Sequence, residues 1–215
     1  MEFRFYDPSN PATVTNGHLP HWEQENSTYF ITWRTADSIP REKAQYWTRQ
    51  REQWLRTHAI NPTDPDWRKK VENLSEDLRR ELRRFSRFLD DEMDSCHGEC
   101  LLRDPDLSRV VADSLHHFDG ERYLLGDFVV MPNHVHVLVG GMDRGSMQLQ
   151  VTSWKRWTSL EINRRTGREG RLWQTESFDH LVRSQSAFER FRRYISDNPA
   201  KAKLREGEYV LWQRR

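Results

Sequence analysis

The chain has 215 residues, with 34 Lys and Arg against 33 Asp and Glu and a formal net charge of +1. Hydrophobic residues make up 35% and charged residues 31% of it, which is typical of a folded, polar protein and excludes a disordered chain. It has no run of about 18 apolar residues, so no membrane span is predicted, and its two cysteines exclude a disulfide framework and favour a cytoplasmic setting.

The near-zero net charge hides an excess of basic residues in the last third of the chain. Residues 151–215 hold 15 Lys and Arg against 8 Asp and Glu, a net charge of +7, so the preceding residues carry −6. Such a segment is either a solvated surface or the electrostatic footprint of a phosphate backbone. Charge alone does not decide between these two interpretations.

The N-terminal half predicts a tail, one strand and a group of helices. Residues 1–20 hold three prolines and no apolar core of a signal peptide, and we expect a mobile tail there. Residues 28–34 are rich in β-branched and aromatic side chains, which predicts a strand. Helical patterns follow over 41–57 and over about 66–93, so we expect a helical insertion at about 41–95.

The middle of the chain predicts a helix followed by a β-hairpin. Asp104 and Pro105 are typical of a helix start, and the apolar pattern continues to about His117. Residues 123–130 and 134–140 read as two strands separated by Pro132, which we expect to pair in an antiparallel manner.

The C-terminal third predicts two helices and one short strand. The first helix spans about 146–165, with core candidates Leu149, Trp154, Trp157 and Leu160, and the second opens at Ser186. Between them, residues 178–182 predict a short strand. Strands mixed with helices and at least one hairpin indicate an α+β fold with an antiparallel sheet, formed by a single domain over 21–205 and followed by a C-terminal tail, 206–215.

Two histidines in the second hairpin strand are candidate metal ligands. Alternate residues of a strand face the same way, so His134 and His136 project from one face while the intervening valines line the other. Two neighbouring imidazoles form half of a metal site. The alternative is a pair of ordinary core or surface histidines.

The last helix places a tyrosine and an asparagine in a useful arrangement. Phe188, Phe191 and Ile195 form its apolar stripe, and Tyr194 falls at the edge of that stripe, where its ring can be buried and its hydroxyl exposed. Asn198 lies four residues further on the same face, and Pro199 is expected to end the helix. The alternatives are a packing tyrosine and an asparagine that only stops the helix.

Together these four side chains suggest phosphoryl transfer. A metal ion bound by His134, His136 and the amide oxygen of Asn198 would polarise a scissile phosphate. Tyr194 would attack phosphorus, displace the 3′-hydroxyl and remain as a 5′-phosphotyrosine. This link conserves the energy of the phosphodiester bond, so strand rejoining would need no nucleotide cofactor.

Two sequence motifs resemble those of a known family. Residues 131–138, Met-Pro-Asn-His-Val-His-Val-Leu, resemble the HUH signature of single-tyrosine transposases, and residues 194–202 resemble their tyrosine-helix motif. More narrowly, the chain resembles the REP-associated tyrosine transposases, because further segments agree in the same order: 19–22, 29–40, 98–100, 117–123, 153–155, 173–174 and 178–180.

This resemblance implies a ferredoxin-like antiparallel sheet, the HUH fold, and a transposase that nicks and joins DNA. It implies Tyr194 as nucleophile and Mg²⁺ or Mn²⁺ held by His134, His136 and Asn198, although two histidines suit Mn²⁺ better. The implied substrate is single-stranded DNA or DNA with hairpin-forming, REP-like palindromic repeats, cleaved and rejoined in transposition or recombination. The enzyme would be a cytoplasmic, nucleoid-associated monomer or homodimer. Candidate DNA contacts are Trp154, Lys155, Arg156, Arg183, Arg190 and Arg193.

The chain departs from the family pattern in two places, a longer helical stretch at 66–95 and a short tail after Leu204. The family's way of binding hairpins therefore does not carry over in detail.

Three other functions stay open. The chain could bind hairpin DNA as a regulator without turnover, hydrolyse a substrate with metal-bound water, or dock a partner through the predicted 66–94 helix. A zinc site at Cys96, His97 and Cys100 is disfavoured because no fourth ligand is evident.

Overall fold

The computed structural model describes residues 2–16, 20–64, 66–143 and 145–215. The chain divides into two compact units, of which unit 1 comprises Met1–Ser38 and Glu99–Arg215 and unit 2 comprises Ile39–Gly98. Unit 2 thus covers the segment for which the sequence predicts a helical insertion. Within the described ranges, no helix combines the length and apolar character that a membrane crossing requires.

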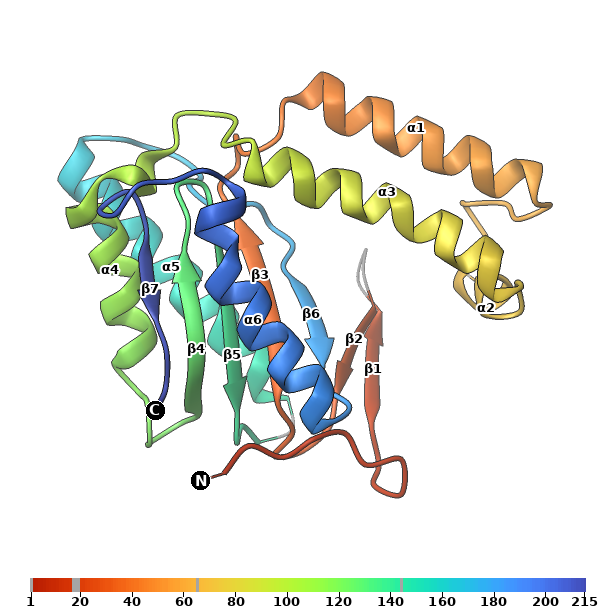
Figure 1. The fold of residues 1–215 in the computed structure, drawn as a ribbon, viewed down its shortest axis with the longest axis horizontal. Coiled ribbons are helices and arrows are strands. Elements are labelled where there is room, and N and C mark those ends of the chain that lie inside the picture. The colour runs from red at the N-terminus through yellow and green to blue at the C-terminus, as the bar shows by residue number, and fades with distance from the viewer. Residues whose placement is uncertain (1, 17–19, 65, 144) are drawn as a thin grey trace. The chain divides into compact units, whose positions relative to one another are not determined.

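A five-stranded antiparallel sheet forms the centre of unit 1 (Figure 1). Its strands, in sheet order, are β6 (Phe178–Leu181), β3 (Tyr29–Arg34), β5 (His134–Gly140), β4 (Leu124–Val130) and β7 (Val210–Trp212). Helix α4 (Pro105–His116) lies between β3 and β4 in sequence, and α5 (Ser146–Thr166) lies between β5 and β6. The chain order β-α-β-β-α-β and this strand order are those of a ferredoxin-like fold, so the predicted α+β class is confirmed.

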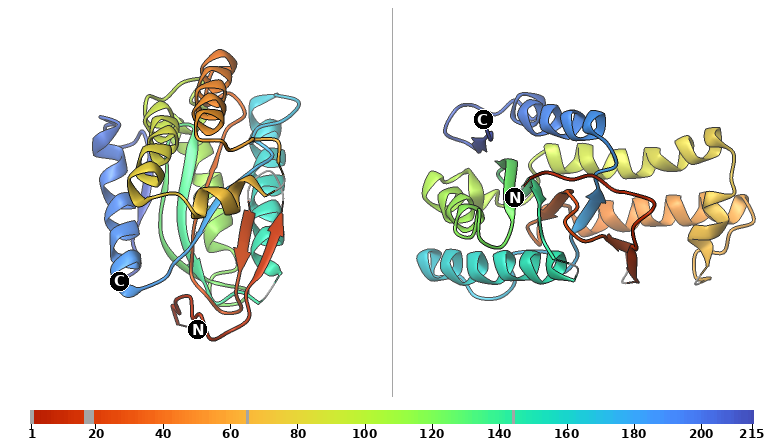
Figure 2. Two further views of the ribbon diagram at one scale, coloured as in Figure 1. Left: turned by 90° about the vertical axis from the view of Figure 1, so that its right-hand side faces the viewer. Right: turned by 90° about the horizontal axis from the view of Figure 1, so that it is seen from below.

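Helices cover both faces of the sheet (Figures 1 and 2). Helices α4 and α5 pack on one face, and α6 (Gln185–Lys201) packs on the other. The core under α6 is formed by buried apolar side chains of β3, β4, β5 and α6 itself, including Phe30, Val129, Leu138, Phe188 and Ile195.

Because side chains alternate between the two faces of β5, the valines of this strand determine which residues face α6. Val135, Val137 and Val139 are fully buried in the core under α4 and α5. Burial of each valine side chain stabilises the fold by roughly 1.5–3 kcal/mol. A register slip of one residue would turn all three to the other face, so these valines fix the direction of His134 and His136 as predicted.

Helix α6 extends beyond the predicted end. We expected Pro199 to stop the helix, but α6 continues to Lys201 with Pro199 inside its last turn. The final carbonyl groups are satisfied there, because the amide of Ala202 donates to the Asn198 carbonyl and the amide of Leu204 donates to the Pro199 carbonyl, each at 3.0 Å. Asn198 therefore lies within α6, and its side chain is buried between the helix and the sheet.

The N-terminal segment is more structured than the predicted mobile tail. Strand β1 (Thr13–Asn16) pairs with β2 (Pro20–Glu23). The rings of Phe3 and Phe5 pack against Phe188, with centroids 5.0 and 5.8 Å away. Aromatic side chains bury a large apolar area, and this contact holds the segment on α6. Residues 1 and 17–19 of the predicted tail lie outside the described residues.

The C-terminal segment also differs from the predicted tail, because β7 pairs with β4. Asp127 is 1% exposed and accepts hydrogen bonds from the Arg192 side chain at 2.9 Å and from the Arg214 amide at 3.0 Å. Arg214 also binds Asp119 at 2.6 Å. Charge-assisted contacts to a buried carboxylate hold the end of the chain against the sheet.

Helix α5 packs through a different stripe from the one predicted. Trp154 is buried, but Leu149, Trp157 and Leu160 are 72%, 49% and 64% exposed. The inward residues of α5 are Met147, Gln150, Val151, Trp154, Thr158 and Ile162, which recur at spacings of three and four. The other three predicted core residues fall outside that stripe.

Unit 2 consists of α1 (Arg41–Thr57), α2 (Trp67–Glu72) and α3 (Glu76–Asp94). The single helix predicted over about 66–93 is wrong, because Ser75 interrupts it: its hydroxyl accepts the amide of Leu78 at 3.4 Å and begins a new helix. Helices α1 and α3 contact each other, with the rings of Trp54 and Phe85 6.4 Å apart. The short 3₁₀ helix Leu101–Arg103 in unit 1 then leads to α4, which Asp104 caps.

Candidate functional site

The side chains of β3 and β5 that face α6 form cross-strand pairs. In the register of the two strands, Thr32 lies opposite His136 and Arg34 lies opposite His134. The rings of the two histidines are 4.7 Å apart, and the residues are 0% and 2% exposed. Opposite residues of an antiparallel pair share a face, so the pairing places a hydroxyl and a guanidinium beside the two imidazoles.

His134 is oriented by its neighbour in the hairpin turn. The Nδ1 atom of His134 is 2.7 Å from Oδ1 of Asn133, and because this oxygen only accepts, Nδ1 donates. Burial and, next, the charge of Arg34 lower the pKa of His134 to about 3. A neutral ring with its proton on Nδ1 keeps the lone pair on Nε2, which is the form that binds a metal.

His136 is held between β3 and α6. Its Nδ1 is 2.7 Å from the Thr32 hydroxyl, and its Nε2 is 3.5 Å from Nδ2 of Asn198. Burial first, and then the neighbouring His134 and Lys201, lower the pKa of His136 well below its usual value. This ring is therefore neutral as well, and its Nε2 is directed towards Asn198.

Asn198 brings a buried amide to the two histidines. It is 0% exposed, and no described group donates a hydrogen bond to its Oδ1. A buried carbonyl oxygen without a donor costs about 1–3 kcal/mol, so Oδ1 is available to a ligand that is not part of the chain. Two neutral imidazoles and an amide oxygen are a chemically suitable set for Mn²⁺, and the described residues contain no cluster of three or more His, Cys, Asp or Glu that could bind a metal.

Tyr194 lies one helical turn before Asn198. Its ring is edge-on to His136, with centroids 5.1 Å apart, and edge-on to Phe30 at 5.7 Å. The residue is half-buried, and Nζ of Lys201 is 4.8 Å from its ring centroid. The structure therefore brings together all four residues predicted for the catalytic and metal site.

A second group of residues supports the site from the β3 side. Nε of Arg34 donates to Oε1 of Gln174 at 2.7 Å, and the Gln174 amide donates to the Arg34 carbonyl at 2.9 Å. Lys155 donates to the carbonyl of Thr175, the next residue, at 2.7 Å. Burial lowers the pKa of Lys155 to about 8. Lys155 thus holds the segment that positions Arg34.

The predicted DNA contacts on α5 do not lie near Tyr194. Trp154 is 3% exposed, stacks on Trp33 and donates its indole N–H to the Tyr123 hydroxyl, so it is a core residue and has no surface to offer DNA. Lys155 and Arg156 lie on α5, which covers the sheet face opposite to α6. Arg156 is exposed there.

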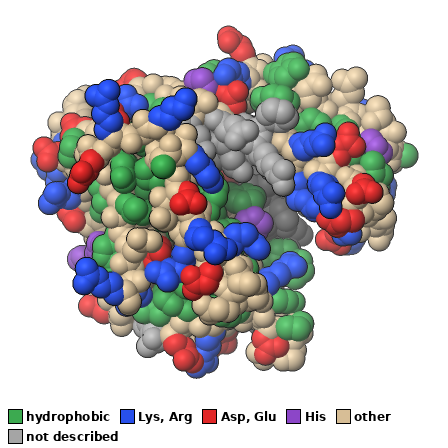
Figure 3. Space-filling model, in the orientation of Figure 1, with side chains coloured by type: hydrophobic (Ala, Val, Ile, Leu, Met, Phe, Trp, Pro, Cys, Tyr) green, Lys and Arg blue, Asp and Glu red, His purple; other side chains and the backbone are tan. Residues whose placement is uncertain are grey.

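The remaining predicted contacts lie on the side of the sheet that carries Tyr194. Arg183 precedes α6, and Arg190 and Arg193 lie on it; all three are exposed. Lys and Arg side chains are spread over this face, with acidic side chains among them (Figure 3). Arg183, Arg190 and Arg193 therefore remain candidate contacts.

Five residues of the site were not predicted: Thr32, Arg34, Asn133, Gln174 and Lys201. Lys201 could have been found, because residues 194, 198 and 201 recur at the four- and three-residue spacing of one helix face. Thr32 and Arg34 alternate along their strand, but only the pairing of β3 with β5 shows which histidine each one faces.

No protein-family model matches the chain, and no curated protein matches it. One solved structure, described as a REP-associated tyrosine transposase bound to a REP hairpin, aligns with 86% of this chain and 74% of its own. Its sequence identity is 14% and its TM-score is 0.43. A match of this size does not establish membership of that family, which stays a prediction from the motifs.

Proposed function

We propose that the chain is a metal-dependent single-strand DNA transesterase that cleaves and rejoins DNA beside hairpin-forming, REP-like repeats. The observation that carries this proposal is the position of Tyr194 against His136, next to a second neutral histidine and the buried amide of Asn198. The motif resemblance supports DNA as the substrate class.

The site would combine a metal with cationic side chains of the chain itself. His134, His136 and Asn198 would hold Mn²⁺ or Mg²⁺, which when bound would polarise the scissile phosphate. Arg34 beside His134 and Lys201 beside Tyr194 would add positive charge on two sides of the phosphate. Thr32 and Asn133 would keep the two imidazoles in the required orientation.

Tyr194 would perform the covalent step. Its hydroxyl oxygen forms a bond to phosphorus while the bond from phosphorus to the 3′-oxygen breaks, which leaves a 5′-phosphotyrosine and a free 3′-hydroxyl. The proton lost by the phenol balances the proton gained by the leaving 3′-oxygen. Attack by a 3′-hydroxyl on the phosphotyrosine reverses the step, so rejoining requires no nucleotide cofactor.

Two features favour tyrosine over water as the nucleophile. The ring of Tyr194 packs edge-on against Phe30 and His136, so binding of the substrate requires little further ordering of this ring. Lys201 places a positive charge 4.8 Å from the centroid of that ring. A hydrolase with a purely structural tyrosine would not need a cation at that position.

The test is a search for a covalent protein–DNA adduct. The protein is incubated with Mn²⁺ and a labelled single-stranded oligonucleotide that carries a palindrome, and the products are separated on a denaturing gel. We expect labelled protein from the wild type and none from Tyr194→Phe. Tyr209→Phe is the matched control, because Tyr209 is half-buried but lies outside the site.

The possible results separate the candidate functions. An adduct that persists in Tyr194→Phe would contradict the assigned nucleophile. Cleavage without any adduct would favour the water-dependent hydrolase. Retained hairpin binding with neither adduct nor cleavage would favour a DNA-binding regulator.

A further inference from the structure

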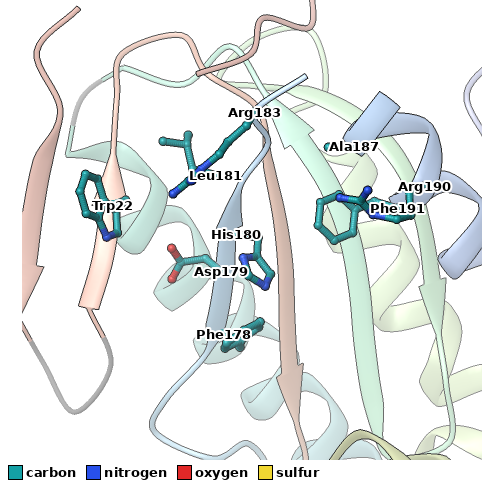
Figure 4. A pocket seen from close by; sticks show the side chains of 9 residues that line it. All are labelled: Trp22, Phe178, Asp179, His180, Leu181, Arg183, Ala187, Arg190 and Phe191. Atoms are coloured by element: carbon teal, nitrogen blue, oxygen red, sulfur yellow. The ribbon is translucent and has the colours of Figure 1, made fainter. Parts of the chain in front are cut away.

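A pocket of about 670 Å³ lies over the edge strand β6, next to the site (Figure 4). Its walls come from β2, from β6, from the turn after β6 and from α6. Figure 4 shows Trp22 on one side of β6 and Arg190 with Phe191 on the other. The candidate site of Tyr194 uses none of these side chains directly.

The pocket offers aromatic surfaces that the core does not use. Trp22 is 40% exposed and Phe178 is 44% exposed, which is unusual for such large apolar side chains. The His180 ring lies 4.7 Å from that of Phe178 and 5.9 Å from that of Phe191. Flat, exposed rings of this kind are suited to stacking on a nucleobase, whatever its identity.

The pocket is also cationic. Arg183 and Arg190 line it, and no carboxylate in the described ranges forms an ion pair with either. Asp179, the one carboxylate among the described residues that line the pocket, accepts a hydrogen bond from Gln148 of α5 at 3.3 Å. An anionic group would therefore find Arg190 on the α6 side of β6 and Arg183 beside the end of that strand.

A chain of stacked rings joins the pocket to the site. The ring of Phe191 stacks on Phe30 at 4.4 Å, and Phe30 stacks on His136 at 5.5 Å. Arg190 precedes Tyr194 by four residues, which is about one helical turn, or ~6 Å along the helix axis. This separation is on the order of the spacing of neighbouring phosphates along a single strand.

We infer that this pocket binds unpaired nucleotides of the single strand, next to the nucleotide that Tyr194 attacks. One base stacks on Trp22, and Arg183 and Arg190 bind phosphates on the two sides of β6. The inference deepens the proposed function and rests on it for the identity of the strand. The pocket itself is a site for a base joined to a phosphate.

The test measures binding without catalysis. The full chain carrying Tyr194→Phe is titrated in EDTA against fluorescein-labelled thymidine oligonucleotides of about 12 nucleotides, a length within the range bound by single-strand grooves. A second probe has the same phosphates but no bases. Trp22→Ala and Arg190→Gln are compared with Trp157→Ala and Arg164→Gln, which change exposed residues of α5.

We expect Trp22→Ala to weaken binding of the thymidine strand about tenfold, the loss expected for one stacked base, and to leave the abasic strand unaffected. Arg190→Gln should weaken both strands, and the two control variants neither. Equal affinities of wild type and Trp22→Ala for the thymidine strand would overturn the stacking role. Unchanged binding in Arg190→Gln would overturn the phosphate role.

Two further arms identify the ligand and separate this inference from the proposed function. Excess dTMP should fail to displace the thymidine strand, and complete displacement would show a site for free mononucleotides instead. Since no step of the assay needs Tyr194 or a metal, the absence of a covalent adduct would count against the proposed function alone.

Discussion

The ring of Tyr194 meets the ring of His136 edge-on, with centroids 5.1 Å apart. His136 is in turn held by the Thr32 hydroxyl at 2.7 Å, so a residue of β3 determines the geometry of the tyrosine's neighbour. The site is thus built from three elements, β3, β5 and α6, whose contacts can be removed one at a time.

Thr32→Val removes the hydrogen bond to His136 while keeping the shape of the side chain. Loss of a group that orients a metal-binding histidine typically weakens metal affinity by about 10–100-fold, and we expect Mn²⁺ affinity to fall within this range. Isothermal titration with Mn²⁺ measures the change.

Thr35→Val provides the matched control for Thr32→Val. Thr35 lies on the same segment and is 2% exposed, but no described group is hydrogen-bonded to its hydroxyl. It should bind Mn²⁺ as the wild type does. If Thr32→Val binds Mn²⁺ as tightly as Thr35→Val and the wild type do, Thr32 does not position a metal ligand.

Asn198→Leu should separate metal binding from stability. Oδ1 of Asn198 is buried without a hydrogen-bond donor among the described residues, which costs about 1–3 kcal/mol in the metal-free protein, and its Nδ2 makes only a long contact of 3.5 Å to His136. We expect Mn²⁺ binding to be lost, while the free energy of unfolding in EDTA does not fall. Urea denaturation measures the second quantity, and a loss of several kcal/mol would mean that the amide is a satisfied structural group.

Arg34→Gln tests whether the guanidinium beside His134 acts on the phosphate. Removal of one charged group that stabilises a transition state typically slows a reaction by at least about tenfold, and we expect this loss in the rate of adduct formation. Gln174→Leu should give a smaller loss, because it keeps the charge and removes only its 2.7 Å hydrogen bond. Arg164→Gln, which changes an exposed ion pair on α5, should react as the wild type, and the same rate in Arg34→Gln would remove Arg34 from the site.

Lys155 should give the protein a measurable dependence of stability on alkaline pH. Its pKa is lowered to about 8 by burial, whereas an unfolded lysine keeps its proton up to about pH 10.4. Between these values the unfolded chain binds more protons, so the free energy of unfolding rises with pH and this contribution is lost as pH falls through 8.

Lys155→Met isolates that contribution, because it keeps a long side chain without the titrating amine. From about pH 7.5 to about pH 9.5, the wild type should gain less than ~1 kcal/mol relative to the variant, since the side chain is partly exposed and screened by solvent. Urea denaturation at both values measures the difference. A difference that is independent of pH would show that the amine is not perturbed.

The sequence predicted the parts of the site that lie within one element. His134 and His136 share a face because strands alternate, and the buried valines between them fix which face. Tyr194 and Asn198 share a face because helices repeat every 3.6 residues. Both relations are local and need no knowledge of the fold.

The parts that were missed depend on contacts between distant segments. Thr32 and Arg34 join the site through the pairing of β3 with β5, which lies at least a hundred residues away in sequence. The strands β1, β2 and β7 are three or four residues long, too short for a periodic pattern. Pro199 predicts a helix stop from the sequence, but the amides of Ala202 and Leu204, which satisfy the last turn of α6, follow it in the chain.

The most direct test of the account locates the nucleotide on the chain. The adduct formed with Mn²⁺ is digested with nuclease and trypsin, and the peptides are analysed by mass spectrometry. Trypsin cuts after Arg193 and Lys201, so the peptide from Tyr194 to Lys201 holds one tyrosine. The account predicts a nucleotide mass on this peptide. A nucleotide on any other peptide, or DNA cleaved with no modified peptide, would contradict it.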